Sequence, residues 1–416
     1  MAASDPRFRA AAFATWRWIK TLRLKAETTR AMRRAKADSY LDATRVLWVA
    51  PEAVKRMAAL GDAYAPRQGY GHVVGGDWDL ATQVNEEQRY FRVVAEVVSK
   101  GIQWRDSETG REARERIAAG GTWMGCDDME PLEERWRYHD DLLLSMRQSG
   151  YLTQRQLRSD RPPSFHESMI DEVLVGVGRD GRILLIDGRH RFAIARLLRI
   201  EKMPVQVGVR HPAWMAFRRD VAAYARRHGG AVPQPLLHPD LDDIPAADDS
   251  RAVFEAIRRE LPAGGDGMVL DIGAQWGYFS HRCEDAGLDC VALESRAEPA
   301  RFLERLRVAC DRRFKVVDDW SVPAPHRGGR PLIGLALERV DPANPRTGRH
   351  YVLTALKQNP VDTLFVRPPS PQGSGTLRGR GAVDESWLDR VMSETGLGRR
   401  DLVAVAAGTP VFKLTH

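Results

Sequence analysis

The sequence has few cysteines and no long hydrophobic run. Its 416 residues include four cysteines and no CxxC pair, which excludes a disulfide scaffold and a zinc ribbon. No run of about 18 apolar residues occurs, so no transmembrane helix is predicted. No signal peptide is expected either, because the apolar run 10–14 is short and Arg17 and Lys20 follow at once. We therefore expect a cytoplasmic protein of two or three domains, at about 150 residues per domain.

The basic excess of the chain is confined to its N-terminal segment. Residues 1–60 contain 13 Lys or Arg and 5 Asp or Glu, whereas the remaining residues contain 50 and 51. Such an arm can contact an anionic membrane surface, nucleic acid or an acidic patch on another subunit, and a solvated helix pair explains the charge equally well. If the arm binds a membrane surface, the protein is expected to be cytoplasmic and membrane-associated. The absence of glycine from residues 8–60 predicts helices over 8–37 and 40–60.

The pattern of elements divides the chain into four segments. They are a basic helical segment (1–65), an α+β domain (66–211), a helix with a Pro/Asp-rich linker (212–262) and an α/β domain (263–416). In the second segment, strands over 171–177 and 182–186 flank Gly178-Arg-Asp-Gly181, which is a hairpin signature. The other elements expected in the two middle segments are helices over 86–100, 131–148, 192–199 and 214–227 and a strand over 203–209.

Strands and helices alternate in the last segment. Strands are expected over 268–272, 290–294, 314–317, 332–337, 363–366, 402–406 and 411–414. Such alternation predicts a mostly parallel sheet with helices on both faces. The predicted fold class is therefore α/β multidomain: N-terminal helices, an α+β middle domain and a Rossmann-like, seven-stranded C-terminal domain.

A glycine turn follows the first of these strands. The run Asp271-Ile-Gly273-Ala-Gln275-Trp-Gly277 ends a strand and opens a helix, and Glu294 ends the next strand, 21 residues after Gly273. In doubly wound sheets a ligand binds at the carboxyl ends of the strands, and an acid after the second strand hydrogen-bonds ribose hydroxyls. The phosphate motif G-x-G-x-x-G is absent, which favours a nucleoside ligand without pyrophosphate.

This turn resembles the first motif of the class I S-adenosylmethionine-dependent methyltransferases, roughly Asp-x-Gly-x-Gly-x-Gly, with glutamine at the middle glycine. The resemblance covers residues 263–416 and implies a last strand that pairs antiparallel. It also implies S-adenosylmethionine as the cofactor, with its methionine near Asp271 and Gly273 and its ribose on Glu294. The residues implied in cofactor binding are Asp271, Gly273, Gln275, Gly277, Glu294 and, near the adenine, Asp318 or Asp319. The alternative is a glycine turn in another Rossmann-like domain.

Absent motifs narrow the choice of acceptor. The chain has no Asn/Asp-Pro-Pro-Tyr after the fourth strand and no Pro-Cys nucleophile, so methylation of a DNA base is not expected. A small molecule or a glycan is the expected acceptor. Glu338 follows the fourth strand and is a candidate general base, with a solvated strand-end acid as the alternative.

A second turn, Asp187-Gly-Arg-His-Arg191, joins a strand to a helix in the middle domain. The N–H groups at a helix N-terminus and two guanidinium groups favour a phosphate there. The turn resembles that of the ParB/sulfiredoxin-like superfamily, and its Asp-Gly-x-His-Arg form is closest to the small-molecule kinases within it. The resemblance implies ATP or CTP with magnesium. The implied phosphate-binding residues are Gly188, Arg189 and Arg191.

By the same resemblance, Asp187 and His190 assist phosphoryl transfer, and Asp187 is also the candidate magnesium ligand. Asp77 or Asp79 is then the candidate catalytic carboxylate. The alternative is a structural turn capped by Asp187. Four other histidines share no ligand spacing and are expected to be ordinary polar positions: His139, His166, His211 and His238.

Three functions follow from these motifs. The preferred one is a methyltransferase whose ParB-like domain binds or hydrolyses a nucleotide. The second is an ATP-dependent small-molecule or glycan kinase with a regulatory methyltransferase-like domain. The third is a nucleic-acid-binding ParB-like protein, which is disfavoured because no helix-turn-helix follows the ParB-like segment.

Overall fold

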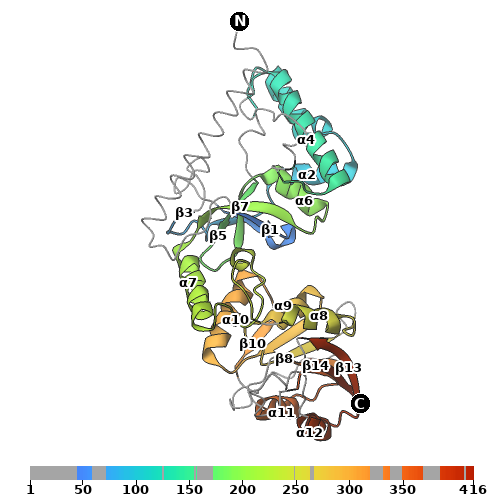
Figure 1. Cartoon of the computed structure of the whole chain (residues 1–416). Helices are drawn as coiled ribbons and strands as arrows, with labels where there is room; N and C mark the ends of the chain where they lie inside the picture. The colour runs from blue at the N-terminus through green and yellow to red at the C-terminus, as the bar shows by residue number, and fades with distance from the viewer. Residues whose placement is uncertain are drawn as a thin grey trace. The chain divides into compact units, whose positions relative to one another are not determined.

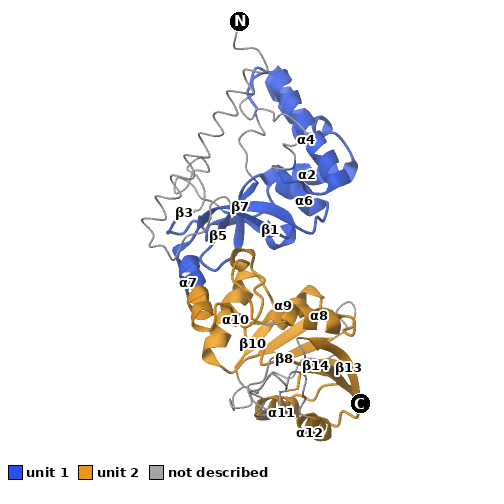
Figure 2. Ribbon diagram, viewed as in Figure 1, with its two compact units in different colours: residues 1–219 blue, residues 220–416 orange. Residues whose placement is uncertain are grey.

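The protein forms two compact units, residues 1–219 and 220–416 (Figure 2). The computed structural model describes residues 45–58, 72–123, 126–153, 156, 172–247, 249–262, 267–318, 331–337, 349–368, 385–406 and 409–416. The predicted helix over 8–37 and most of the basic arm lie outside these residues. In the described part of the chain, no helix is both long and apolar enough to cross a bilayer.

Unit 1 contains a mixed sheet with the strand order β1-β7-β5-β6-β2-β4, and β3 pairs with β7 (Figure 1). The strands are β1 Val46–Val49, β2 Arg56–Ala58, β3 His72–Val73, β4 Thr82–Val84, β5 Val173–Val177, β6 Ile183–Asp187 and β7 Met203–Arg210. The predicted hairpin is confirmed, because β5 and β6 pair antiparallel across the turn that starts at Gly178. The resemblance of this unit to the ParB/sulfiredoxin-like superfamily stays a prediction.

The predicted helix over 40–60 is wrong in its described part. Residues 46–49 form β1, which pairs antiparallel with β7, and residues 56–58 form β2, which pairs parallel with β6. Between them lies only the short 3-10 helix Pro51–Ala53. The reason is period-two burial: Leu47 and Val49 are buried on one face, whereas Trp48 is 48% exposed. Branched and aromatic side chains in that pattern favour a strand.

The helices of unit 1 pack together around α6 Arg189–Leu197, which also contacts β5. The other helices are α2 Arg89–Lys100, α3 Glu108–Ala118 and α4 Met129–Ser149, with the 3-10 helix η6 Trp104–Asp106 before α3. Ser107 caps α3 by accepting a hydrogen bond from the Gly110 N–H at 3.0 Å. A Cβ on Gly110 would lie 2.5 Å from the carbonyl oxygens of Trp104 and Arg105, so only glycine lets α3 lie this close to η6.

Unit 2 contains a second seven-stranded sheet, with the order β10-β9-β8-β11-β12-β14-β13. Its strands are β8 Met268–Ile272, β9 Asp289–Leu293, β10 Lys315–Val317, β11 Leu332–Ala336, β12 Thr363–Val366, β13 Arg399–Ala406 and β14 Thr409–Thr415. All seven predicted strands are present, and β14 pairs antiparallel with β12 as predicted. This order makes unit 2 a Rossmann-like α/β fold that is compatible with the class I methyltransferase fold.

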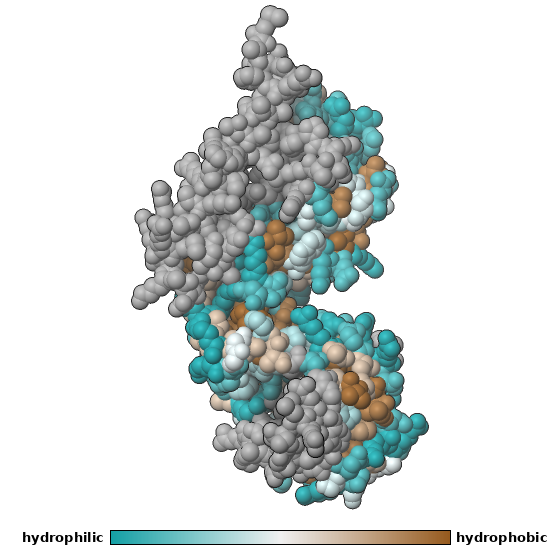
Figure 3. All heavy atoms as spheres, viewed as in Figure 1, coloured by the Kyte–Doolittle hydropathy of each residue, from teal (hydrophilic) through white to brown (hydrophobic). Residues whose placement is uncertain are grey.

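Two apolar cores lie on the two faces of the unit 2 sheet. One contains side chains of α8 Ser250–Arg258 and α9 Tyr278–Asp285, and the other those of α11 Arg349–Gln358 and α12 Glu385–Thr395. The segment 232–245, which composition suggests is a linker, packs into this unit, with Val232, Gln234 and Leu241 buried. Figure 3 shows a largely hydrophilic face with a hydrophobic patch over β13, the strand in which Leu402 and Val405 are exposed.

Candidate functional sites

The glycine turn of unit 2 lies where two parallel strands end side by side. β8 and β9 pair in register from Met268 and Asp289 to Ile272 and Leu293. The N–H of Gly273 then donates to the Leu293 carbonyl at 2.8 Å. This register brings the residues after both strands to one edge of the sheet, as a doubly wound ligand site requires.

Three residues of the turn have left-handed backbone. They are Gly273, Gln275 and Gly277, with φ angles of 73°, 53° and 84°. Glycine adopts this conformation without strain, whereas a glutamine there is uncommon. A Cβ on Gly277 would also lie 2.2 Å from the Leu303 side chain. The last glycine of the motif is therefore required for packing between the turn and α10 Ala297–Ala309.

Asp271 lies beneath the turn and is almost fully buried. Its Oδ2 accepts hydrogen bonds from the Ser280 N–H at 3.0 Å and from the Ser280 hydroxyl at 2.6 Å. Burial raises the pKa of Asp271 to about 7, the Ser280 hydrogen bonds oppose the shift, and the Glu294 charge adds to it. Asp271 therefore holds the start of α9, and its carboxyl group titrates near neutral pH.

The Glu294 side chain is only 1% exposed, and its carboxylate accepts four hydrogen bonds from within the protein. Oε1 accepts from the N–H and Nε of Arg296 at 2.8 and 2.9 Å. Oε2 accepts from the Gln275 N–H at 2.9 Å and from Nη2 of Arg296 at 2.7 Å. A carboxylate offers about four acceptor positions, so Glu294 is saturated, with three of its four bonds coming from Arg296.

Gln234 contributes a side chain to the same turn. Its buried Oε1 accepts hydrogen bonds from the N–H groups of Trp276 at 3.2 Å and Tyr278 at 3.1 Å. The Trp276 ring stacks on Phe302 at a centroid distance of 4.1 Å. The N–H groups at the start of α9 are thus bound by a residue 42 and 44 positions earlier in the chain, a contact that the motif alone does not predict.

Five of the seven predicted cofactor residues meet at this edge. They are Asp271, Gly273, Gln275, Gly277 and Glu294. Asp318 is exposed directly after β10, next to the edge, since the Glu294 N–H donates to the Val317 carbonyl. Asp319 and the predicted base Glu338 lie outside the described residues.

These residues fit an adenosyl cofactor if the Arg296 side chain leaves the Glu294 carboxylate. Ribose hydroxyls donate hydrogen bonds to the acid after the second strand. Glu294 is in the right place, but its acceptor positions are filled by N–H donors, mostly those of Arg296. The Arg296 side chain is 23% exposed and can move toward solvent, so two ribose hydroxyls can replace its two guanidinium donors, while the Arg296 backbone N–H stays on Oε1.

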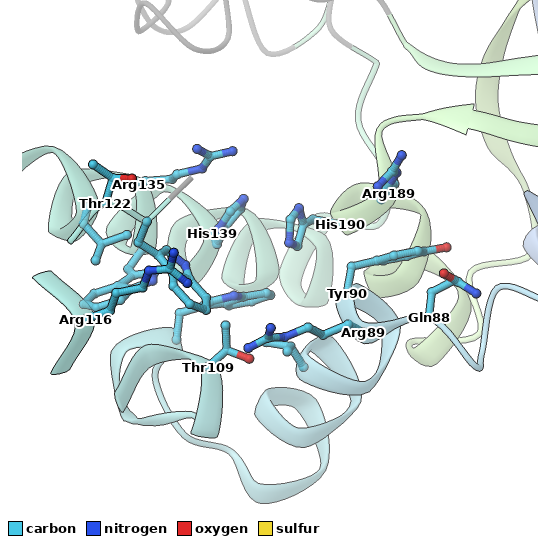
Figure 4. A pocket seen from close by; sticks show the side chains of 15 residues that line it. Gln88, Arg89, Tyr90, Thr109, Arg116, Thr122, Arg135, His139, Arg189 and His190 are labelled. Atoms are coloured by element: carbon cyan, nitrogen blue, oxygen red, sulfur yellow. The ribbon is translucent and has the colours of Figure 1, made fainter. Parts of the chain in front are cut away.

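Unit 1 contains a cavity of about 470 Å³ between its helices (Figure 4). Its lining residues come from α2, α3, α4, η6, the start of α6 and nearby loops. They are Gln88, Arg89, Tyr90, Val93, Trp104, Thr109, Arg116, Thr122, Trp123, Leu132, Arg135, Trp136, His139, Arg189 and His190. The predicted turn therefore reaches this cavity with Arg189 and His190.

Two histidine rings lie together in the cavity. The His139 and His190 centroids are 4.4 Å apart, and Trp104 lies 5.0 Å from His139 and 6.0 Å from His190. Burial lowers the pKa of His190 to about 4, the charges of Arg135 and Arg189 add to the shift, and Asp187 opposes it. His190 is therefore neutral at pH 7.

The other residues of the predicted turn do not line the cavity. Asp187 is exposed, and its Oδ1 accepts a hydrogen bond from the Gly188 N–H at 2.7 Å. Gly188 has a φ of 81°, and a Cβ there would lie 3.1 Å from the Val173 Cα. Arg191 lies near Gly188 and does not line the cavity, and its charge acts on Tyr151. Within this turn, Gly188 thus provides the left-handed backbone position, and Arg189 and His190 line the cavity.

Asp77 and Asp79 lie elsewhere in unit 1. Both accept hydrogen bonds from the Arg179 guanidinium, at 2.7 Å for Asp77 and 2.8 Å for Asp79. Burial alone would raise the pKa of Asp79, but the hydrogen bonds and charge of Arg179 outweigh burial and lower it. Both carboxylates hold the β5–β6 hairpin, and neither lines the cavity.

Most of the cavity wall is not predicted from the sequence. The sequence predicts an ordinary polar position at His139, yet this residue is buried beside His190. The missed signal is helical spacing on α4, where Leu132, Arg135, Trp136 and His139 recur on one face. In the described residues, no group of three His, Cys, Asp or Glu side chains is placed to hold a metal ion.

No family model and no curated protein matches the chain. Similar solved structures include the bifunctional kinase-methyltransferase WbdD, at 13% identity and a TM-score of 0.34, over 47% of this chain and 46% of that one. The chain therefore spans about half the length of WbdD.

Two smaller methyltransferase structures are also similar. One is a TehB-like SAM-dependent methyltransferase from Corynebacterium glutamicum ATCC 13032 Kitasato, at 16% identity and a TM-score of 0.31, over 48% of this chain and 98% of that one. The other is the methyltransferase domain of bacterial CtHen1, at 14% identity and a TM-score of 0.29, over 40% and 95%. The fold assignment of unit 2 rests on its strand order and not on these similarities.

Proposed function

We propose that the protein is an S-adenosylmethionine-dependent methyltransferase whose cofactor binds at the carboxyl edge of β8 and β9. The observation that carries this proposal is the contact between the two predicted cofactor elements. The glycine turn donates the Gln275 N–H to Glu294 at 2.9 Å, in a sheet whose strand order is compatible with that fold. A strand order alone supports many functions, so the contact and the motif together carry the assignment.

The residues at this edge have distinct roles in the proposal. Glu294 receives the ribose hydroxyls after Arg296 moves aside. Gly273 allows a close approach of the backbone to the ligand. Asp271 anchors α9 through Ser280 and keeps the turn in position. S-adenosylmethionine, when bound, supplies a methyl group activated by its sulfonium sulfur. The proposed acceptor is a small molecule or a glycan.

Binding of S-adenosylhomocysteine to the full chain, followed by calorimetry, tests this proposal. Replacing Glu294 with glutamine removes the charged acceptor, so binding should weaken about 10-fold or more. Replacing Arg296 with glutamine removes the two guanidinium donors that compete for Glu294, so binding should become tighter. Arg282→Gln is the matched control, because Arg282 is 27% exposed and also pairs with carboxylates of unit 2.

The two variants separate a binding site from a structural ion pair. If Glu294 and Arg296 only stabilise the fold, both variants lower the melting temperature and neither changes the heat of binding. Lack of binding by the unmodified chain at millimolar ligand would overturn the proposal. Tighter binding by the Arg296 variant, with no change in the Arg282 variant, would support it.

The proposal does not extend to phosphoryl transfer in unit 1. The two acids that this activity requires, Asp187 and Asp77, do not line the cavity that contains His190. Asp187 binds its neighbour's N–H, and Asp77 pairs with Arg179. No contact among the described residues therefore favours a kinase over a methyltransferase.

A further inference from the structure

Positive charge gathers in the cavity of unit 1. Among the described residues that line it, four are arginines and none is an aspartate or glutamate. Arg89 forms an ion pair with Glu112 at the surface. For Arg116, Arg135 and Arg189, the described part of the chain provides no ion pair. Uncompensated guanidinium groups around a concave site attract an anion, and their planar forks suit phosphate or carboxylate oxygens.

Two of these arginines act on the same histidine. Arg135 extends from α4 and Arg189 from the start of α6, and both charges lower the pKa of His190. Figure 4 shows Arg135 and Arg189 on opposite sides of the His139 and His190 rings. An anion above these rings would lie between two cations that come from different helices. A neutral imidazole there can also donate or accept one hydrogen bond.

The rest of the wall is aromatic. Tyr90, Trp104, Trp123 and Trp136 line the cavity together with the two histidine rings. The Arg89 guanidinium lies over the Trp123 ring at 5.2 Å, and the Arg189 guanidinium lies 6.0 Å from the Tyr90 ring. Flat rings and guanidinium planes of this kind stack on planar ligands. The volume of about 470 Å³ is within the usual range for small-molecule sites.

We propose that this cavity binds a small organic anion that carries a planar ring, with the anionic group between Arg135 and Arg189 and the ring against the aromatic wall. Nucleoside phosphates combine these two features and are the probes for the site. The site requires neither Asp187 nor a magnesium ion. It is independent of the cofactor site proposed for unit 2, because no residue is shared.

Calorimetry on the full chain in the presence of EDTA tests the proposal. The probes are AMP, CMP and ATP, with adenosine as the ring alone and inorganic phosphate as the anion alone. We expect at least one nucleotide to bind about 10-fold or more tightly than either adenosine or phosphate, because its ring and its phosphate group each contribute contacts. The proposal is overturned if no nucleotide binds at millimolar concentration. It is also overturned if phosphate or adenosine alone binds as tightly as the best nucleotide.

Three variants of α4 and α6 locate the binding site. Arg135→Gln and Arg189→Gln should each weaken nucleotide binding about 10-fold, the value of one charge-assisted contact. Arg137→Gln is the matched control, because Arg137 is exposed on the same helix and does not line the cavity. If Arg137→Gln weakens binding as much as Arg135→Gln, the attraction is general surface charge and the cavity assignment fails. Unchanged melting temperatures show that the variants remain folded.

Discussion

Replacing Asp271 with asparagine should stabilise unit 2 in a pH-dependent way. The Asp271 side chain is buried, and burial raises its pKa to about 7 from an ordinary value near 4. At about 1.4 kcal/mol per pKa unit, the ionised carboxylate costs the folded state about 4 kcal/mol above pH 7. The asparagine side chain carries no charge, and its oxygen can accept the two Ser280 hydrogen bonds.

The sign of the effect follows from the raised pKa. The unmodified protein keeps the full contribution of protonated Asp271 below about pH 4 and loses it as the pH rises through 7. Asp271→Asn should therefore be more stable by about 2–4 kcal/mol at pH 8, because the buried amide N–H groups offset part of the gain. The two proteins should be similar at pH 4.

Scanning calorimetry between pH 4 and pH 8 measures this difference. For a unit of this size we expect the melting temperature to rise about 2–4 °C per kcal/mol. Asp318→Asn is the control, because Asp318 is exposed next to the same edge. A stability difference that is the same at pH 5 and pH 8 would refute the assignment of a buried, largely protonated Asp271.

Two further predictions concern the glycine turn and the cavity. Gly277→Ala should destabilise unit 2 by about 1–3 kcal/mol more than Gly287→Ala in urea unfolding, because only the first Cβ meets Leu303, while both glycines have positive φ. A nucleotide phosphate near His190 should oppose the effect of the arginines and raise the imidazole pKa, so binding should tighten from pH 8 to pH 5. His190→Gln should remove the part of this pH dependence that comes from the imidazole. The buffer dependence of the binding heat measures it, and an unchanged pH profile in the variant would contradict the prediction.

The sequence predicts unit 2 better than unit 1 for a physical reason. The central strands of a parallel sheet are buried on both faces and read as short apolar runs between turn residues. Runs such as Met268–Ile272 and Thr363–Val366 therefore predict their strands directly. In unit 1, β1 and β2 are only four and three residues long, so the absence of glycine outweighs their alternation in the sequence and favours a helix.

The site residues that escaped prediction depend on tertiary contacts. His139 and His190 are 51 positions apart, and only the packing of α4 near α6 brings their rings together. Arg179 takes Asp79 as its partner across 100 positions, so no local spacing could remove Asp79 from the catalytic candidates. The Arg296 pair is local, yet whether Glu294 faces Arg296 or a ligand depends on the backbone after β9.

A crystal structure of the full chain with S-adenosylhomocysteine would show whether the cofactor binds at the glycine turn. We expect ligand density at the carboxyl edge of β8 and β9, with both ribose hydroxyls hydrogen-bonded to Glu294. The Arg296 side chain should then have left the Glu294 carboxylate, which it contacts at 2.7 Å without ligand. Density elsewhere, or an intact Glu294–Arg296 pair in crystals grown at saturating ligand, would contradict this expectation.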